Sequence, residues 1–65
     1  MTAAEKFKQA CRENGYTARR VADVTGLSLS TVHSYFQGVR YPSRRTKRIL
    51  IERLEGIEIE KIFNE

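Results

Sequence analysis

The fold of this chain is decided by residues 18–37, ARRVADVTGLSLSTVHSYFQ. Two helices that cross at roughly 90 to 120° over a turn of about 3 to 4 residues leave little room where their backbones approach, and Ala22 is small enough for that place. Gly26 can adopt the positive φ that bends the chain between the helices. Leu27 covers the junction with an apolar side chain, and Val32 lies at the spacing that turns it back toward the first helix. This pattern predicts two steeply crossed helices joined by a tight turn.

Local signals predict three further helices and no strand. The capping-box spacing of Thr2 and Glu5 starts a first helix, which Asn14-Gly15 ends. Pro42-Ser43 opens a fourth helix, which Gly56 ends. Thr17 and Ser28 can cap the two helices of the crossed pair, which are expected at about 18–25 and 29–37, and a short fifth helix is expected at about 58–63.

The order and spacing of these pieces resemble the lambda-repressor-like (Cro and Xre type) family of small helix-turn-helix domains. Gly-Val-Arg-Tyr-Pro-Ser at 38–43 is similar to the family's Gly-x-x-x-Pro-Ser loop, and residues 54–63 are similar to its closing helix, loop and short helix. Together the similar parts cover roughly residues 17–63. The resemblance implies an all-α, five-helix, lambda-repressor-like domain that spans residues 1–65 as a single unit and binds double-stranded DNA. Leu29 departs from the family pattern, which often has glutamine at that place.

The positive charge is concentrated around the motif. The chain carries a net charge of +4, and residues 17–48 contain seven basic side chains against one acidic side chain, a net charge of +6. Residues 49–65 have the opposite balance, with two basic and five acidic side chains. A basic cluster is often only a solvated surface, but one that surrounds a helix-turn-helix favours a polyphosphate partner.

The remaining composition contains no pattern for catalysis, metal binding or a membrane. The chain has one histidine and one cysteine, so neither a disulfide nor a cluster of zinc ligands is available, and Cys11 is expected to be a small buried side chain. No Ser/His/Asp set, paired carboxylates or phosphate-binding glycine loop occurs, and no apolar run is long enough for a membrane span. We therefore expect no enzyme activity, cofactor or small-molecule substrate, and a soluble protein of a reducing cytoplasm.

The outer face of the second motif helix is expected to read bases. If Val32 and Tyr35 face the core, four side chains of this helix turn outward, and its N-terminal half is the part that enters a major groove. The candidates are Leu29, Ser30, His33 and Ser34. Alternatives remain open, because Leu29 could belong to the core, Ser30 could cap the helix and His33 could contact a phosphate. With no Arg, Asn or Gln expected on this face, direct readout should be modest, with specificity supplemented by paired half-sites or DNA shape.

Phosphate contacts are expected from the starts of the first motif helix and the fourth helix. Free N–H groups at a helix N-terminus favour an anion, and basic or hydroxyl side chains flank both places. The expected phosphate-binding residues are Thr17, Arg19, Arg40, Ser43 and Arg44. Arg45, Lys47 and Arg48 cannot all face one duplex from one helix, so one or two of them should be solvated.

The end of the chain has a surplus of apolar residues. Ile57, Ile59, Ile62 and Phe63 fall within seven residues, and a short helix should not be able to direct all four into one small core. We therefore expect a self-association surface here, which would form a homodimer and space two recognition helices on DNA. The alternative is that Ile59 and Phe63 close the core over the first and fourth helices. The core itself is expected to contain Phe7, Cys11, Val21, Ala22, Leu27, Val32, Tyr35, Leu50 and Leu54.

The resemblance implies a transcriptional regulator, in particular a small repressor of a phage or mobile element that acts as a dimer on operator DNA within the nucleoid of a bacterial host cell. An excisionase-like accessory factor that bends DNA is a second interpretation. A protein-binding adaptor or inhibitor on the same fold is a third.

Overall fold

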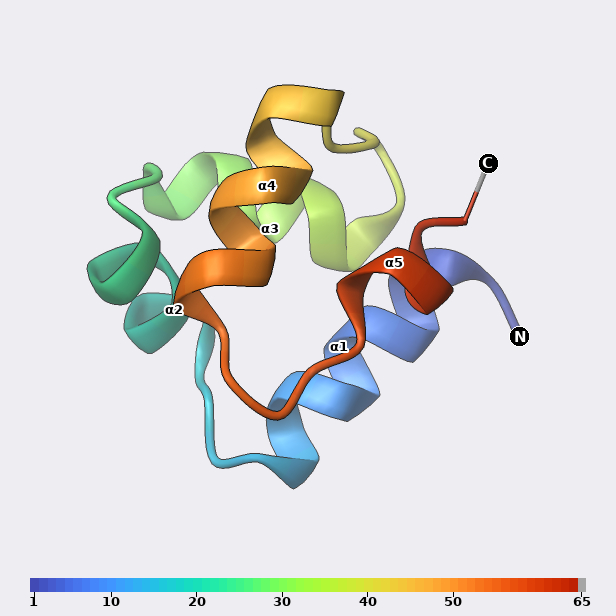
Figure 1. Cartoon of the computed structure of the whole chain (residues 1–65), viewed down its shortest axis with the longest axis horizontal. Coiled ribbons are helices and arrows are strands. Elements are labelled where there is room, and N and C mark those ends of the chain that lie inside the picture. Colours follow the sequence, from blue (N-terminus) through green and yellow to red (C-terminus); the bar gives the residue numbers. More distant parts are fainter. Residues whose placement is uncertain (65) are drawn as a thin grey trace.

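The computed structural model describes residues 1–64, which contain five α-helices and no strand (Figure 1). This confirms the all-α, five-helix fold that the sequence predicts. The helices are α1 (Ala3–Glu13), α2 (Ala18–Thr25), α3 (Leu29–Gln37), α4 (Arg44–Arg53) and α5 (Ile59–Ile62). In Figure 1, α2 and the start of α3 lie at one side of the molecule, whereas α5 lies beside α1 near both termini.

Side-chain caps set the starts of the first four helices. The Thr2 and Glu5 capping box is present, because the Glu5 backbone N–H donates to Thr2 Oγ1 at 3.1 Å and the Thr2 N–H donates to Glu5 Oε1 at 2.9 Å. Thr17, Ser28 and Ser43 cap α2, α3 and α4 in the same manner, each accepting from the backbone N–H three residues later. These bounds confirm the predicted helix starts.

Gly26 makes the turn of the motif. It has a φ of 79°, in the left-handed region that favours glycine, and its N–H donates to the Ala22 carbonyl at 2.9 Å. Thr25 strengthens the same junction, since its hydroxyl donates to the Val21 carbonyl at 2.6 Å. The chain therefore leaves α2 sharply enough to start α3 three residues later.

The fourth helix ends earlier than the sequence indicated. α4 ends at Arg53, and Gly56 lies in the turn between α4 and α5 with a φ of 85°. A Cβ atom at Gly56 would lie 2.7 Å from the side-chain oxygen of Asn14, so the turn packs closely against the end of α1. This close approach brings the last part of the chain back against the end of α1.

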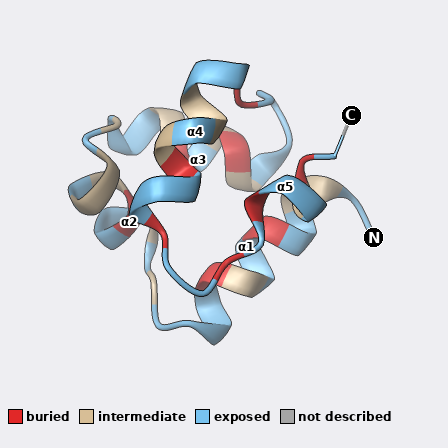
Figure 2. Cartoon of the chain, in the orientation of Figure 1, coloured by how far each residue is buried: buried red, intermediate tan, exposed pale blue. Residues whose placement is uncertain are grey.

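The core lies where α1 to α4 and the C-terminal segment meet (Figure 2). The predicted core is confirmed, except that Ala22 and Leu27 are half-buried and pack against its edge. The buried hydrophobic residues are Phe7, Cys11, Val21, Val32, Tyr35, Leu50, Leu54, Ile57, Ile59 and Phe63. Three aromatic rings pack against one another in a tilted arrangement, with the Phe7 ring centroid 5.3 Å from that of Phe36 and 5.1 Å from that of Phe63.

The C-terminal apolar residues belong to this core, and the expected exposed self-association surface at residues 57–63 is wrong. Ile57, Ile59 and Phe63 are 8%, 1% and 1% exposed, and Ile62 is half-buried. The physical reason is the turn at Gly56, which folds α5 against both α1 and α4. The alternative, in which Ile59 and Phe63 close the core over α1 and α4, is confirmed.

Cys11 is fully buried in this core, as expected from its place on the apolar side of α1. Burial raises the pKa of its thiol to about 12, because the surroundings disfavour the charged thiolate. Within residues 1–64, no helix has the length and apolarity that a membrane crossing requires.

Candidate nucleic-acid interface

The second motif helix, α3, has one buried and one exposed side. Val32 and Tyr35 are 0% and 5% exposed, which anchors the helix against α1 and α2. Leu29 is 39% exposed, and Ser30 and His33 are exposed as well. Leu29 is therefore not a core residue, and three of the four proposed base-reading side chains lie on the outer surface of α3.

Ser34 is less available than the other three. It is half-buried, and its hydroxyl donates to the Ser30 carbonyl at 3.0 Å within the same helix. The N-cap of α3 is Ser28, whose hydroxyl accepts from the Thr31 N–H at 3.1 Å. Ser30 consequently does not serve as the cap, which leaves it one residue inside the exposed start of the helix.

His33 lines a shallow hollow that α1, α2 and α3 share. Thr17 and Ala18, at the start of α2, lie on one wall. Gln37 lines the same hollow from α3, and Lys8 and Arg12 line it from α1. The exposed side of α3 therefore lies directly beside the N-terminus of α2.

This hollow corrects the expectation that the outer face of α3 has no amide side chain. Gln37 is exposed and follows His33 by four residues, which places the two side chains on the same helix face. The four-residue spacing is visible in the sequence, but Gln37 is the last residue of α3, and the sequence alone does not show that it shares a hollow with His33. Lys8 and Arg12 were missed because nothing in the sequence relates α1 to the motif.

The N-terminus of α2 presents a hydroxyl, an arginine and free backbone N–H groups together. Thr17 Oγ1 accepts from the Arg20 N–H at 3.1 Å, so its own O–H remains able to donate to an outside acceptor. Arg19 is exposed in the first turn, and α2 has no acidic residue there. The combination suits a phosphate group.

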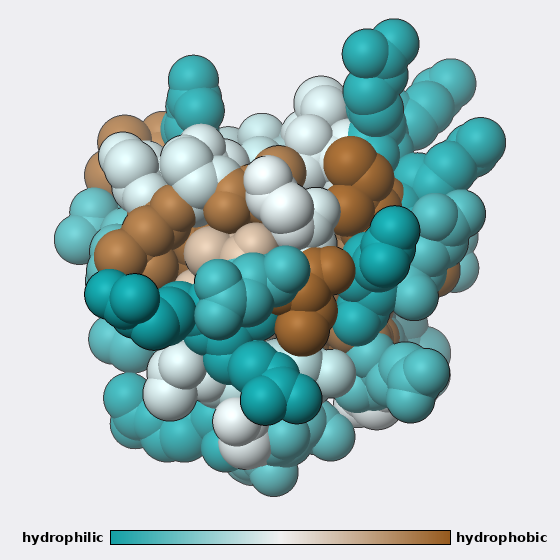
Figure 3. Space-filling model, turned by 90° about the vertical axis from the view of Figure 1, so that its left-hand side faces the viewer, coloured by the Kyte–Doolittle hydropathy of each residue, from teal (hydrophilic) through white to brown (hydrophobic). Residues whose placement is uncertain are grey.

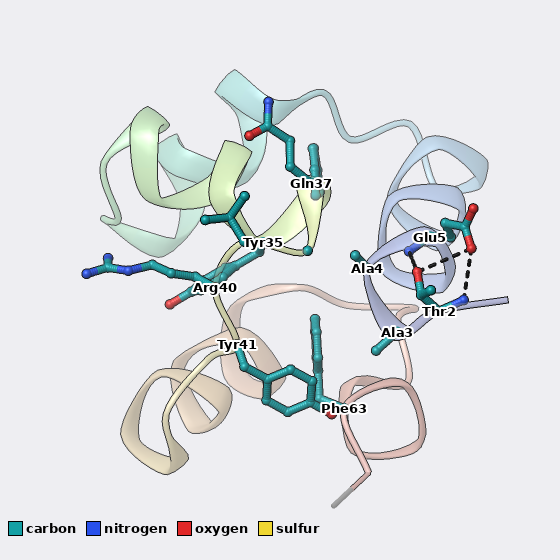
Figure 4. Close-up of a pocket in the computed structure, with 12 residues that line it drawn as sticks. Thr2, Ala3, Ala4, Glu5, Tyr35, Gln37, Arg40, Tyr41 and Phe63 are labelled. Carbon is teal, nitrogen blue, oxygen red and sulfur yellow. Dashed lines mark hydrogen bonds between the residues drawn. The ribbon is translucent and has the colours of Figure 1, made fainter.

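The N-terminus of α4 has the same character, with one difference. Ser43 caps the helix, but its hydroxyl also donates to Thr46 Oγ1 at 3.1 Å, so it is more occupied than Thr17. Arg44 is exposed in the first turn and Arg40 is exposed in the preceding loop. Figure 4 shows Arg40 extending away from the pocket beneath it, whereas Tyr41 packs its ring edge on Phe63 with centroids 5.2 Å apart.

One of the three remaining basic residues of α4 is used inside the molecule. Lys47 is half-buried, and its Nζ donates to the Phe63 carbonyl at 3.2 Å. Arg45 and Arg48 are exposed. Lys47 therefore helps to hold the C-terminal segment against α4, whereas the two arginines are solvated, in line with the expectation that not all three face one duplex.

No ion pair neutralises the basic side chains of the motif among residues 1–64. Among residues 1–64 the one ion pair is Lys61 to Glu58, at 3.4 Å, and it lies in the C-terminal segment. Figure 3 views the side that carries α2 and the start of α3, where hydrophilic side chains surround smaller apolar patches. Such a surface fits a hydrated polyanion that also offers apolar groups, as thymine methyls do in a DNA groove.

The comparisons with known proteins agree with this geometry. The profile of the family described as Helix-turn-helix matches residues 7–62, which include most of α1 and all of α2 to α5. No curated protein and no solved structure gave a match. Because the profile covers most of the chain and the five helices have the corresponding arrangement, the chain belongs to the lambda-repressor-like (Cro and Xre type) helix-turn-helix family of DNA-binding domains.

Proposed function

We propose that the chain is a sequence-specific regulator of transcription, a small phage or mobile-element repressor that acts as a homodimer on operator DNA in the bacterial cytoplasm, associated with the nucleoid. The observation that carries this proposal is the exposed side of α3, which shares a hollow with the N-terminus of α2. Exposed arginines lie in the first turns of both α2 and α4. A groove-reading helix needs such neighbours, because phosphate contacts fix its position while its own side chains contact the bases.

Each exposed side chain of α3 has a suitable partner in a major groove. Leu29 is apolar and fits a thymine methyl, and the Ser30 hydroxyl can donate to or accept from several base edges. His33 can donate to N7 or O6 of guanine, and Gln37 can form two hydrogen bonds with adenine. Ser34 has a smaller role, since its hydroxyl is already bonded to Ser30.

Phosphates on either side of the groove would be held by the two N-termini. At the start of α2, one phosphate would be bound by Thr17 and Arg19. At the start of α4, a second phosphate would be bound by Arg40, Ser43 and Arg44. Lys8 and Arg12 extend the first site, since they share the hollow of Thr17. These contacts orient the domain without distinguishing sequences.

Selection of bound duplexes from a random pool tests this function. The expected result is enrichment of one short sequence repeated as an inverted pair, with the half-sites about 10 base pairs apart as two-fold binding requires. A pool that remains random after repeated rounds would contradict sequence-specific regulation. A circular-permutation assay on the selected site then separates a repressor, for which a modest bend is expected, from an accessory factor whose action is to bend the duplex sharply.

A further inference from the structure

Leu29 is the one exposed side chain of α3 that cannot form a hydrogen bond. It is 39% exposed, and it is the sole exposed large hydrophobic residue of α2 and α3. The other exposed side chains of α3 carry a hydroxyl, an imidazole and an amide group, and they belong to Ser30, His33 and Gln37. Leu29 therefore differs from its neighbours in needing an apolar partner.

Hydrogen bonds hold the first turn of α3 in place around Leu29. The Thr31 N–H donates to Ser28 Oγ at 3.1 Å, and the Ser28 hydroxyl donates to Thr31 Oγ1 at 2.8 Å. Leu27, just before the helix, is half-buried and packs against the edge of the core. The start of α3, which is the part of a recognition helix that enters the major groove, consequently presents Leu29 and Ser30 to the bases.

The apolar group that a major groove offers to a leucine is the C5-methyl group of a pyrimidine. The other groups along the base-pair edges are hydrogen-bond donors and acceptors, and a leucine that covers them removes their water without replacing its hydrogen bonds. Thymine carries the methyl group beside its O4 acceptor, and a cytosine methylated at C5 carries the same methyl group beside its N4 donor. Because a leucine side chain forms no hydrogen bond, it responds to the methyl group that the two bases share.

We propose that Leu29 makes DNA binding by this chain depend on the C5-methyl group of one pyrimidine in each half-site, supplied by thymine or by 5-methylcytosine. Methylation of a cytosine at that position strengthens binding, and cytosine methylation is thereby a regulatory signal for this chain. The inference rests on the proposed function, because it names the base group that α3 recognises.

The methyl group can be removed or added without any change to the protein. In duplexes that carry one half-site of the selected sequence, each thymine is replaced in turn by deoxyuridine and each cytosine in turn by 5-methylcytosine. Fluorescence anisotropy gives the Kd of the wild type for each duplex. At the responding position, thymine is then compared with deoxyuridine, and 5-methylcytosine with cytosine, so that the hydrogen-bonding groups within each pair are the same.

The methylated base of each pair should bind about fourfold more tightly, since burial of one such carbon group contributes about 0.8 kcal/mol. Leu29→Ala should reduce both differences to less than about twofold, because it removes most of the apolar side chain, whereas Leu29→Met should retain them. Val39→Ala is the control, since Val39 is an apolar residue that is 75% exposed in the loop after α3, and both differences should persist in it. Circular dichroism should show the same helix content for every variant.

Three results would overturn the inference: a wild-type Kd that no methyl group changes, a methyl effect that Leu29→Ala retains in full, or one that Val39→Ala also removes. A difference between thymine and deoxyuridine without one between the two cytosines would overturn the regulation by cytosine methylation. In all of these cases the wild type still binds its half-site, so a failure to bind the selected duplex would instead refute the proposed function.

Discussion

The helix α3 and the segment 57–63 use their side chains in opposite ways. α3 buries Val32 and Tyr35 but leaves its other side to solvent, whereas the C-terminal segment directs three of its four large apolar side chains into the core. The comparison separates the residues that hold the fold together from those to which the proposed function assigns recognition. Changes in the C-terminal segment should therefore affect stability, and changes on the outer side of α3 should affect DNA binding alone.

The largest effect is expected from Ile59→Ala. Ile59 is 1% exposed, and truncation of a buried isoleucine costs about 2–5 kcal/mol of unfolding free energy, a large part of the total stability of so small a domain. Val39→Ala is the control, because Val39 is 75% exposed and should change stability by less than about 0.5 kcal/mol. Urea unfolding followed by circular dichroism measures both. Equal effects at the two positions would show that α5 is not part of the core.

Leu29→Ala and His33→Ala should act on specificity alone. Each should reduce discrimination between the selected site and a changed base pair by about 1–3 kcal/mol, because each removes a contact to a base edge. Fluorescence anisotropy with matched duplexes measures this difference, and affinity for random DNA should hardly change. If Leu29→Ala unfolds the chain instead, Leu29 contributes to stability, and its assignment to DNA binding alone is wrong.

Arg44→Ala should weaken binding to specific and random DNA about equally. Loss of one phosphate contact should lower the slope of log K against log salt by roughly 1. Arg53→Ala is a matched control on the same helix, since Arg53 is exposed in the last turn of α4 rather than the first. A change in sequence preference on Arg44→Ala, or the same slope change on Arg53→Ala, would show that the phosphate contacts are assigned to the wrong end of α4.

The smallest effect concerns the cap of α1. The hydrogen bond from the Thr2 backbone N–H, together with the Thr2 hydroxyl, lowers the pKa of Glu5 from its ordinary value of 4.5. Because the pKa of Glu5 is lower in the folded chain, the ionised carboxylate stabilises the fold at pH values above the pKa that Glu5 has in the unfolded chain. This contribution is lost as the pH falls through the pKa that Glu5 has in the folded chain. The stability difference between wild type and Glu5→Gln should therefore shrink on acidification. A difference that does not change with pH would contradict the role of the Glu5 charge.

The helices were predictable because their signals are local. The capping residues Thr2, Thr17, Ser28 and Ser43 and the turn at Gly26 act within a few residues of themselves, and each lies where the sequence predicted. The exposed side of α3 followed from helical periodicity once Val32 and Tyr35 were assigned to the core. These parts of the site needed no knowledge of how the helices pack.

The remaining parts depend on contacts between distant segments. The burial of Phe63 depends on the turn at Gly56 against Asn14, and Lys8 and Arg12 approach His33 only because α1 crosses behind the motif. Likewise, Lys47 Nζ donates a hydrogen bond to the Phe63 carbonyl, whereas the sequence alone would count Lys47 as available to bind a phosphate. Sequence spacing does not contain these relations, so the burial of the C-terminal segment and the position of Lys8 and Arg12 beside the motif had to come from the structure.

The division of the DNA interface is tested most directly by amide chemical-shift mapping during titration with the selected duplex. The account predicts that the largest changes occur at the start of α2, along the outer side of α3 including His33, and at Arg40 to Arg44. The amides of residues 57–63 should change little, since their side chains close the core. Changes concentrated in that C-terminal segment, with α3 unaffected, would contradict the assignment of α3 as the recognition helix.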